Sequence, residues 1–209
     1  MHLVLLLLTL AALSCGPLLY AAARRRPDLA RLLDRFVLVA VAGLVLVEVL
    51  PPLIRAGGWT GIAFLLLGLL GPTAVERLLS RARREAHIAA LVLAFVGLVV
   101  HSLGDGAALS PGVDGQARLA LGLAVALHSI PVGLLVWWLI APAFGVRVAA
   151  GALLAMCAST VIGYRFGIPL SELLGVRGWE WFQALVAGTI LHVAFGRPHL
   201  HDHGGHAAD

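Results

Sequence analysis

Residues 36–54 read FVLVAVAGLVLVEVLPPLI, a stretch whose only formal charge is Glu48. A helix that crosses the hydrocarbon core of a bilayer needs about 20 mostly apolar residues, so this stretch is long enough to span a membrane. Six other stretches have the same character, at about 2–22, 58–79, 87–109, 117–140, 143–164 and 179–196. We therefore predict an all-α, polytopic membrane helix bundle with about seven transmembrane helices.

The composition of the whole chain agrees with this prediction. Of its 209 residues, 60% are hydrophobic and 12% are charged, whereas soluble domains are about 45–50% apolar and about 25% charged. A single water-soluble domain is therefore excluded. The chain divides into a predicted transmembrane bundle at 1–196 and a His-rich cytoplasmic tail at 197–209. The two cysteines lie in apolar stretches and assign no redox compartment.

Arginines set the predicted orientation, because all 15 basic residues are arginine and they gather between the apolar runs. This pattern indicates membrane topology rather than nucleic-acid binding. The second and fourth links hold only Arg55 and Arg118, while the first and third hold Arg24, Arg25, Arg26, Arg31, Arg35, Arg77, Arg81, Arg83 and Arg84. Basic loops stay in the cytoplasm, so we expect an outward N-terminus, a cytoplasmic C-terminus and a bacterial inner (plasma) membrane location.

Two connections are predicted from local sequence. The fifth and sixth apolar segments are separated only by residues 141–143, which predicts a tight antiparallel pair that turns at Pro142. Residues 165–181 are expected to form a short interfacial turn. Trp179 and Trp181 would then lie at headgroup depth, where amphipathic rings are favoured.

Two acidic side chains and three histidines lie well inside the apolar segments: Glu48, Asp105, His101, His128 and His192. Placing a charged group there costs roughly 2.5–3.5 kcal/mol on insertion scales, which favours a shared site that faces the bundle interior. Taken singly, each histidine has an alternative interpretation as a hydrogen bond between helices. Glu48 has the alternative of reaching the membrane interface, and His192 is the weakest candidate.

The spacing of His101 and Asp105 predicts a metal site. Residues four apart lie on one face of a helix, one turn from each other, and a nitrogen and an oxygen ligand can there hold one divalent ion. The alternative is a hydrogen bond between the two side chains. His128, in LAVALHSIPVGLLV, is the expected third ligand, and Glu48 is expected to attract the ion from outside.

The tail sequence HLHDHGGH carries further candidate ligands: His199, His201, Asp202, His203 and His206. Alternating histidines in a flexible segment can hold Zn²⁺ or Ni²⁺ loosely through imidazole. The alternative is a solvated terminus without a metal-binding role.

Five motifs together resemble the ZIP family of divalent-metal transporters. The stretches HSLGDGAAL from His101 and HSIPVGLL from His128 are similar to the fourth-span and fifth-span motifs of that family. Weaker similarity extends over VEVLPP at 47–52, TAVERLL at 73–79 and AGTILHVAF at 187–195. The resemblance covers most of the chain, and the predicted topology agrees with it.

The resemblance implies one complete metal site rather than the family's two. The first site maps to His101, Asp105, His128 and Val132, so three of its four ligands remain. The second site would use Ser102 and Ser129, whose hydroxyls are weaker cation ligands than carboxylates. The family's eighth span is also missing, so a single-site relative with seven spans is implied.

The expected function is transport of a divalent cation, with Zn²⁺ as the substrate and Fe²⁺, Mn²⁺ or Co²⁺ as alternatives. We expect membrane lipid and the metal ion as partners, and a homodimer is left open. One alternative is an intramembrane zinc hydrolase of the ceramidase-like type, in which the metal activates a water and Glu48 acts as base. The other is a transport-inactive ZIP-like regulator.

Overall fold

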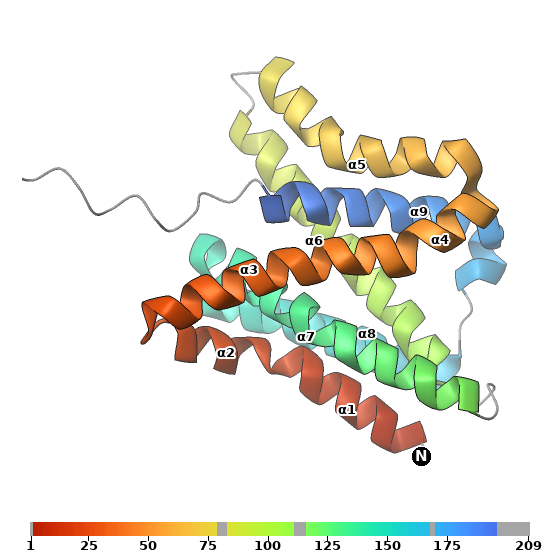
Figure 1. The fold of residues 1–209 in the computed structure, drawn as a ribbon, viewed down its shortest axis with the longest axis horizontal. Coiled ribbons are helices and arrows are strands. Elements are labelled where there is room, and N and C mark those ends of the chain that lie inside the picture. Colours follow the sequence, from red (N-terminus) through yellow and green to blue (C-terminus); the bar gives the residue numbers. More distant parts are fainter. Residues whose placement is uncertain (1, 79–82, 111–115, 168–169, 196–209) are drawn as a thin grey trace, which may run out of the picture.

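The structure is a computed structural model that describes residues 2–78, 83–110, 116–167 and 170–195. Every regular element within these ranges is helical, which confirms the all-α prediction. Figure 1 shows their order: α1 (His2–Ser14), α2 (Gly16–Ala23), α3 (Pro27–Leu44), the π-helix η1 (Val45–Val49), α4 (Leu50–Pro52), the π-helix η2 (Leu53–Gly57), α5 (Gly58–Leu78), α6 (Arg83–Ala108), α7 (Gln116–Phe144), α8 (Val146–Phe166) and α9 (Leu170–Phe195).

Five helical stretches in the described residues are long and apolar enough to cross a membrane: His2–Ala23, Pro27–Val75, Ile88–Ala108, Leu119–Phe144 and Val146–Phe166. The second of these has 49 residues and holds the predicted segments 36–54 and most of 58–79. The last predicted segment lies in α9, which is helical but is not among these five stretches. The chain is thus an integral membrane helix bundle, although fewer spans qualify than were predicted.

Glycines with positive φ stand at two of the turns between helices in the described residues. Gly58 has a φ of 59° where η2 gives way to α5, and Gly145 has a φ of 88° between α7 and α8. Only glycine adopts such angles at little cost. The predicted turn at Pro142 is wrong, because Pro142 lies inside α7. A proline so close to the end of a helix removes one hydrogen bond without ending the helix.

The predicted interfacial turn at 165–181 is also wrong over most of its length. Helix α8 continues to Phe166 and α9 begins at Leu170, with one break in helical geometry at Gly175. Trp179 and Trp181 therefore lie on α9. The indole Nε1 of Trp181 donates a hydrogen bond of 3.0 Å to the carbonyl oxygen of Gly57, which attaches α9 to the end of η2.

Glycines also let the helices that carry the site approach closely. A Cβ atom added at Gly106 of α6 would overlap the carbonyl of Thr160 on α8, and one added at Gly163 of α8 would overlap the carbonyl of Leu103. Gly68 and Gly188 make a similar contact between α5 and α9. Small residues at such positions are typical of membrane helix pairs, and here they fix α6 against α8.

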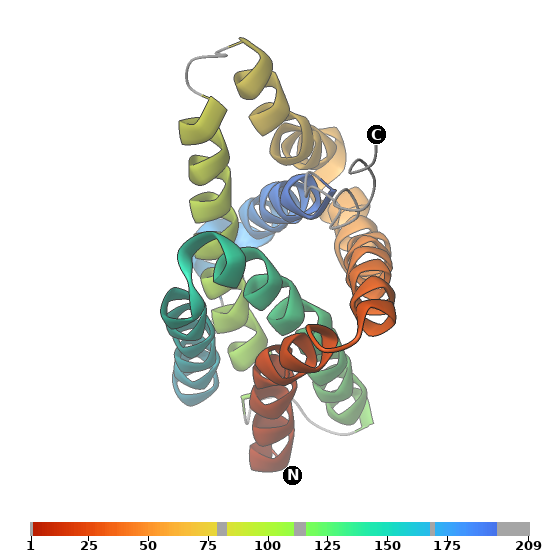
Figure 2. The same ribbon diagram turned by 90° about the vertical axis from the view of Figure 1, so that its left-hand side faces the viewer.

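Helix α7 lies at the centre of the bundle and has the largest buried share of the candidate spans. It packs against α1, α2, α3 and α8, while α9 packs against α5 and α6 (Figures 1 and 2). Leu134, Leu135 and Trp138 of α7 form a buried cluster with Val37 and Val41 of α3. This packing brings α3 and its continuation η1 beside α7, which places Glu48 near His128.

Candidate metal site

His101 and Asp105 of α6 lie side by side, as their spacing predicts. The distance from His101 Nε2 to Asp105 Oδ1 is 3.5 Å, and the side chains are 23% and 15% exposed. Because both residues belong to one continuous helix, α6 alone fixes their relative position.

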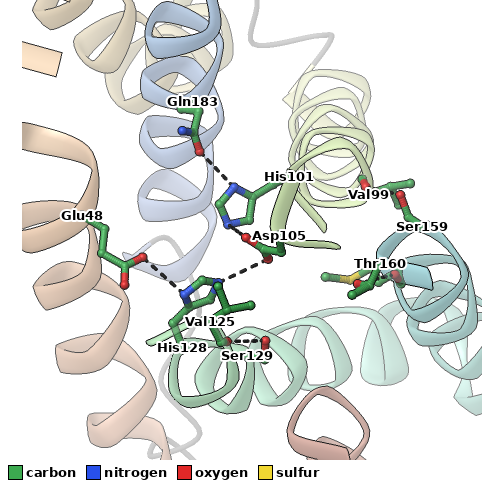
Figure 3. A network of polar contacts seen from close by, with 11 residues as sticks. Glu48, Val99, His101, Asp105, Val125, His128, Ser129, Ser159, Thr160 and Gln183 are labelled. Atoms are coloured by element: carbon green, nitrogen blue, oxygen red, sulfur yellow. Dashed lines mark hydrogen bonds and ion pairs between the residues drawn. The ribbon is translucent and has the colours of Figure 1, made fainter. Parts of the chain in front are cut away.

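His128 joins this pair from α7. Its Nε2 lies 3.3 Å from the other carboxylate oxygen of Asp105, Oδ2, and its side chain is only 7% exposed. The two imidazole rings are 5.7 Å apart between centroids. Ligand atoms of His101, Asp105 and His128 all lie within 4.8 Å of one another. The predicted three-residue group is thus brought together by two helices (Figure 3).

The second nitrogen of each imidazole, Nδ1, faces a side-chain oxygen from another helix. Nδ1 of His101 lies 3.0 Å from Oε1 of Gln183 on α9. Nδ1 of His128 lies 3.3 Å from Oε2 of Glu48, in a charge contact without hydrogen-bond alignment. The acceptor at Nδ1 of His101 favours the tautomer with its proton there, which leaves the lone pair of the neutral imidazole on Nε2. The aligned hydrogen bond of His128 is instead at Nε2, to Oδ2 of Asp105, so a metal ion would replace a proton at this contact.

This arrangement resembles the environment of metal-binding histidines in general. Such histidines usually give their second ring nitrogen to a carboxylate, an amide or a carbonyl oxygen, which orients the ring. Tetrahedral ligands at zinc–nitrogen and zinc–oxygen distances put neighbouring ligand atoms about 3.3 Å apart. The two contacts to Asp105, at 3.5 Å to Oδ1 and 3.3 Å to Oδ2, are close to that spacing. The three residues could therefore hold one divalent ion through two nitrogens and at least one carboxylate oxygen.

Glu48 owes its position to an irregular stretch of helix. It lies in η1, a single π-helical turn that precedes Pro51 and Pro52. Isolated π-helical turns inside α-helices often occur at functional sites. The extra residue in the turn changes the direction of the side chains that follow, and Glu48 here faces His128 across the bundle (Figure 3). Its side chain is 38% exposed, more than any of the three candidate ligands.

The surroundings of the site differ along the bundle. A cavity of about 50 Å³ borders His101 and Gln183 and is otherwise lined by apolar side chains, among them Val45, Leu98 and Val132. These apolar residues lie between the site and the end of the bundle where α6 begins at Arg83. No polar group other than His101 and Gln183 lines this space.

The weaker candidates take other positions. Ser129 is buried and donates a 2.7 Å hydrogen bond to Val125 of its own helix, and Ser102 is buried on α6. Nδ1 of His192 lies 3.2 Å from the hydroxyl of Thr73, outside the three-residue group. His199, His201 and His203 lie outside the described residues.

Val132 and Gln183 together explain how His101 is surrounded. Val132, the position that the ZIP resemblance assigns to a fourth ligand, lines the apolar cavity beside His101. Gln183 approaches His101 from α9 instead. Sequence reasoning missed Gln183 because it considered only titratable groups inside apolar segments. An amide in the apolar helix WFQALVAGTIL was the signal that could have revealed it.

Comparisons with known proteins found no relative of this chain. A scan against protein-family models and searches of curated proteins and of solved structures found no match to the chain.

Proposed function

We propose that this protein carries a divalent cation, zinc first among them, across a membrane through one site formed by His101, Asp105 and His128. One observation carries the proposal. Two imidazole Nε2 atoms converge on one carboxylate inside an apolar bundle, while both Nδ1 atoms contact other acceptors. A set of two imidazoles and a carboxylate suits Zn²⁺, and it also accepts Fe²⁺, Mn²⁺ or Co²⁺.

The charge of the site supports a divalent substrate. With both imidazoles neutral, Asp105 and Glu48 give the site a formal charge of −2, which one divalent ion balances. Such a balance lowers the cost of placing the ion among apolar helices, where isolated charges are expensive. A monovalent ion would leave one negative charge uncompensated.

The position of Glu48 favours a carrier over the hydrolase alternative. A base that activates a metal-bound water must lie within hydrogen-bond reach of that water. Glu48 contacts Nδ1 of His128, on the opposite side of the ring from the nitrogen that faces Asp105. The hydrolase nevertheless has one observation in its favour, since three protein ligands leave a fourth position open, as in catalytic zinc sites.

The distribution of arginines supports a direction for the molecule. Arg24–Arg26, Arg77 at the end of α5 and Arg83 at the start of α6 lie at one end of the bundle, while the other end has Arg55 of η2, Arg165 at the end of α8 and Arg177 in the first part of α9 (Figure 1). We place the arginine-rich end in the cytoplasm of a bacterial cell, by the positive-inside rule. In a variant without native cysteines, Arg55→Cys should react with an impermeant maleimide in intact cells, and Arg25→Cys only after permeabilisation. The reverse pattern would contradict this orientation.

The proposal is tested by zinc uptake into sealed proteoliposomes, followed with a trapped fluorescent indicator. The double variant His101→Ala/Asp105→Ala is expected to reduce uptake to the level of protein-free liposomes, because it removes two of three ligands. His192→Asn is the matched control, since it changes a histidine of the same bundle outside the site and retains a polar partner for Thr73. It is expected to transport like the unmodified protein.

Three outcomes are informative. Uptake that persists in a folded double variant would refute the proposal, and Asp105→Asn provides a milder variant if the double variant does not fold. Hydrolysis of a lipid amide or ester without zinc flux would favour the ceramidase-like alternative. Tight zinc binding by the unmodified protein without flux would favour the transport-inactive regulator.

A further inference from the structure

Glu180 is a buried carboxylate that the proposed site does not use. It lies on α9 and is 9% exposed, and its Oε2 has no hydrogen-bond partner among the described residues. Leaving a charged oxygen buried without a partner is costly. The bundle therefore keeps at this position a group whose binding capacity is unused.

The helix places Glu180 next to the metal site. Gln183, which contacts His101, follows Glu180 by three residues and so lies on the same face, about 4.5 Å further along the helix axis. Trp179 lies close to Gly104, the residue before Asp105. Glu180 is therefore at about the level of Asp105, one turn from Gln183 toward the end of the bundle where α9 begins.

The face of α9 that carries Glu180 is turned toward η1. Ala187 lies two turns from Glu180 on that face and packs against Val45 and Val49. These two valines flank Glu48 in the π-helical turn. Ala187, Val45 and Val49 line the apolar cavity, whereas Trp181, next to Glu180, contacts Gly57 at the end of η2. Glu180 thus lies beyond the cavity, toward η2.

Two arginines on the elements next to Glu180 do not pair with it. Arg177 precedes it by three residues on α9 and is exposed. Arg55 of η2 donates from its Nε to the carbonyl of Pro51. No ion pair joins either arginine to Glu180 in the described part of the chain. Neither arginine therefore neutralises this carboxylate.

We propose that Glu180 is an outer station that binds the divalent cation, still partly hydrated, before the ion reaches His101, Asp105 and His128. The inference rests on the proposed function and extends it, because it adds a second and weaker cation site on the path. Its carboxylate would bind the ion mainly through charge. Gln183, one turn further along α9, would offer the next oxygen.

The test uses Co²⁺ as the probe with the purified, full-length protein in which the tail histidines that could bind cobalt themselves, His199, His201, His203 and His206, are replaced by alanine. Visible absorption reports cobalt bound by histidine in the inner site, and equilibrium dialysis with metal analysis reports total bound cobalt. This parent protein is expected to bind two Co²⁺ ions, one tightly with visible absorption and one weakly without it. Glu180→Gln should retain the tight ion and its spectrum and lose the weak one. Glu172→Gln, an exposed carboxylate on the same helix, should retain both.

The arms of this experiment separate the two proposals. If His101→Ala/Asp105→Ala retains the tight, coloured ion, the proposed function fails. If Glu180→Gln retains two ions, or if the parent protein binds only one, the outer station fails while the inner site stands.

Thermal unfolding distinguishes a ligand from a structural residue. An unpartnered buried charge destabilises the metal-free bundle, so Glu180→Gln should raise its unfolding temperature. If Glu180 instead stabilised the fold by pairing with Arg177, both Glu180→Gln and Arg177→Gln would lower that temperature. Such a decrease, with the weak cobalt ion retained in Glu180→Gln, would overturn the proposal.

Discussion

Asp105→Ala is expected to abolish specific zinc binding by the purified protein. Asp105 contacts both candidate imidazole ligands, with one carboxylate oxygen directed at each. Its loss removes the sole anionic ligand and leaves two neutral nitrogens. We expect zinc affinity to fall well beyond the roughly 10–100-fold that is typical when an outer-shell partner is removed.

A zinc-chelator competition titration in detergent measures this loss. Asp105→Asn, which preserves shape and removes the charge, should bind zinc more weakly than the unmodified protein and more tightly than Asp105→Ala. Asp28→Asn is the control, because Asp28 is an exposed aspartate that pairs with Arg31 at the start of α3. An affinity within error of the unmodified protein for folded Asp105→Ala would show that zinc binds elsewhere.

Glu48→Gln is expected to weaken zinc binding about 10–100-fold, or about 1.4–2.8 kcal/mol at 1.4 kcal/mol per tenfold. Glu48 would act on the metal through His128, because its carboxylate contacts Nδ1 and helps to orient the ring. Glutamine retains the size of the side chain but removes the negative charge.

At His101, replacing Gln183 by glutamate should change the zinc affinity in the opposite direction. Gln183→Glu would put a carboxylate beside Nδ1 of His101 and should tighten zinc binding, whereas Gln183→Leu should weaken it by removing the acceptor. The same competition titration measures all three variants. If Glu48→Gln and Gln183→Glu shift the affinity in the same direction, these residues do not tune the metal through the imidazoles.

The site could be predicted from the sequence where neighbouring residues define it. The four-residue spacing of His101 and Asp105 is a property of one helix, and the structure confirms that they lie together. His128 joined the prediction because a histidine within an apolar segment is costly unless it has a partner. In each case the physical rule acts within one segment or on one residue.

The contacts between segments could not be predicted in the same way. Gln183 contacts His101 because α9 packs against α6. Patterns within one segment do not predict which helices pack together. The position of Glu48 depends on a π-helical turn, which periodicity arguments do not detect. The apolar pattern also did not distinguish Pro142 from Gly145 as the turn, since only backbone geometry requires the glycine.

X-ray absorption at the zinc K-edge of the zinc-loaded, purified protein tests the central claim most directly. The account predicts one zinc per chain at the inner site, with two imidazole nitrogens and at least one carboxylate oxygen at about 2.0–2.2 Å. Any zinc at the outer station is removed beforehand by a brief wash with a weak chelator. A spectrum without imidazole scattering would contradict the proposed site. Imidazole scattering that persists in His101→Ala/His128→Ala would also contradict it.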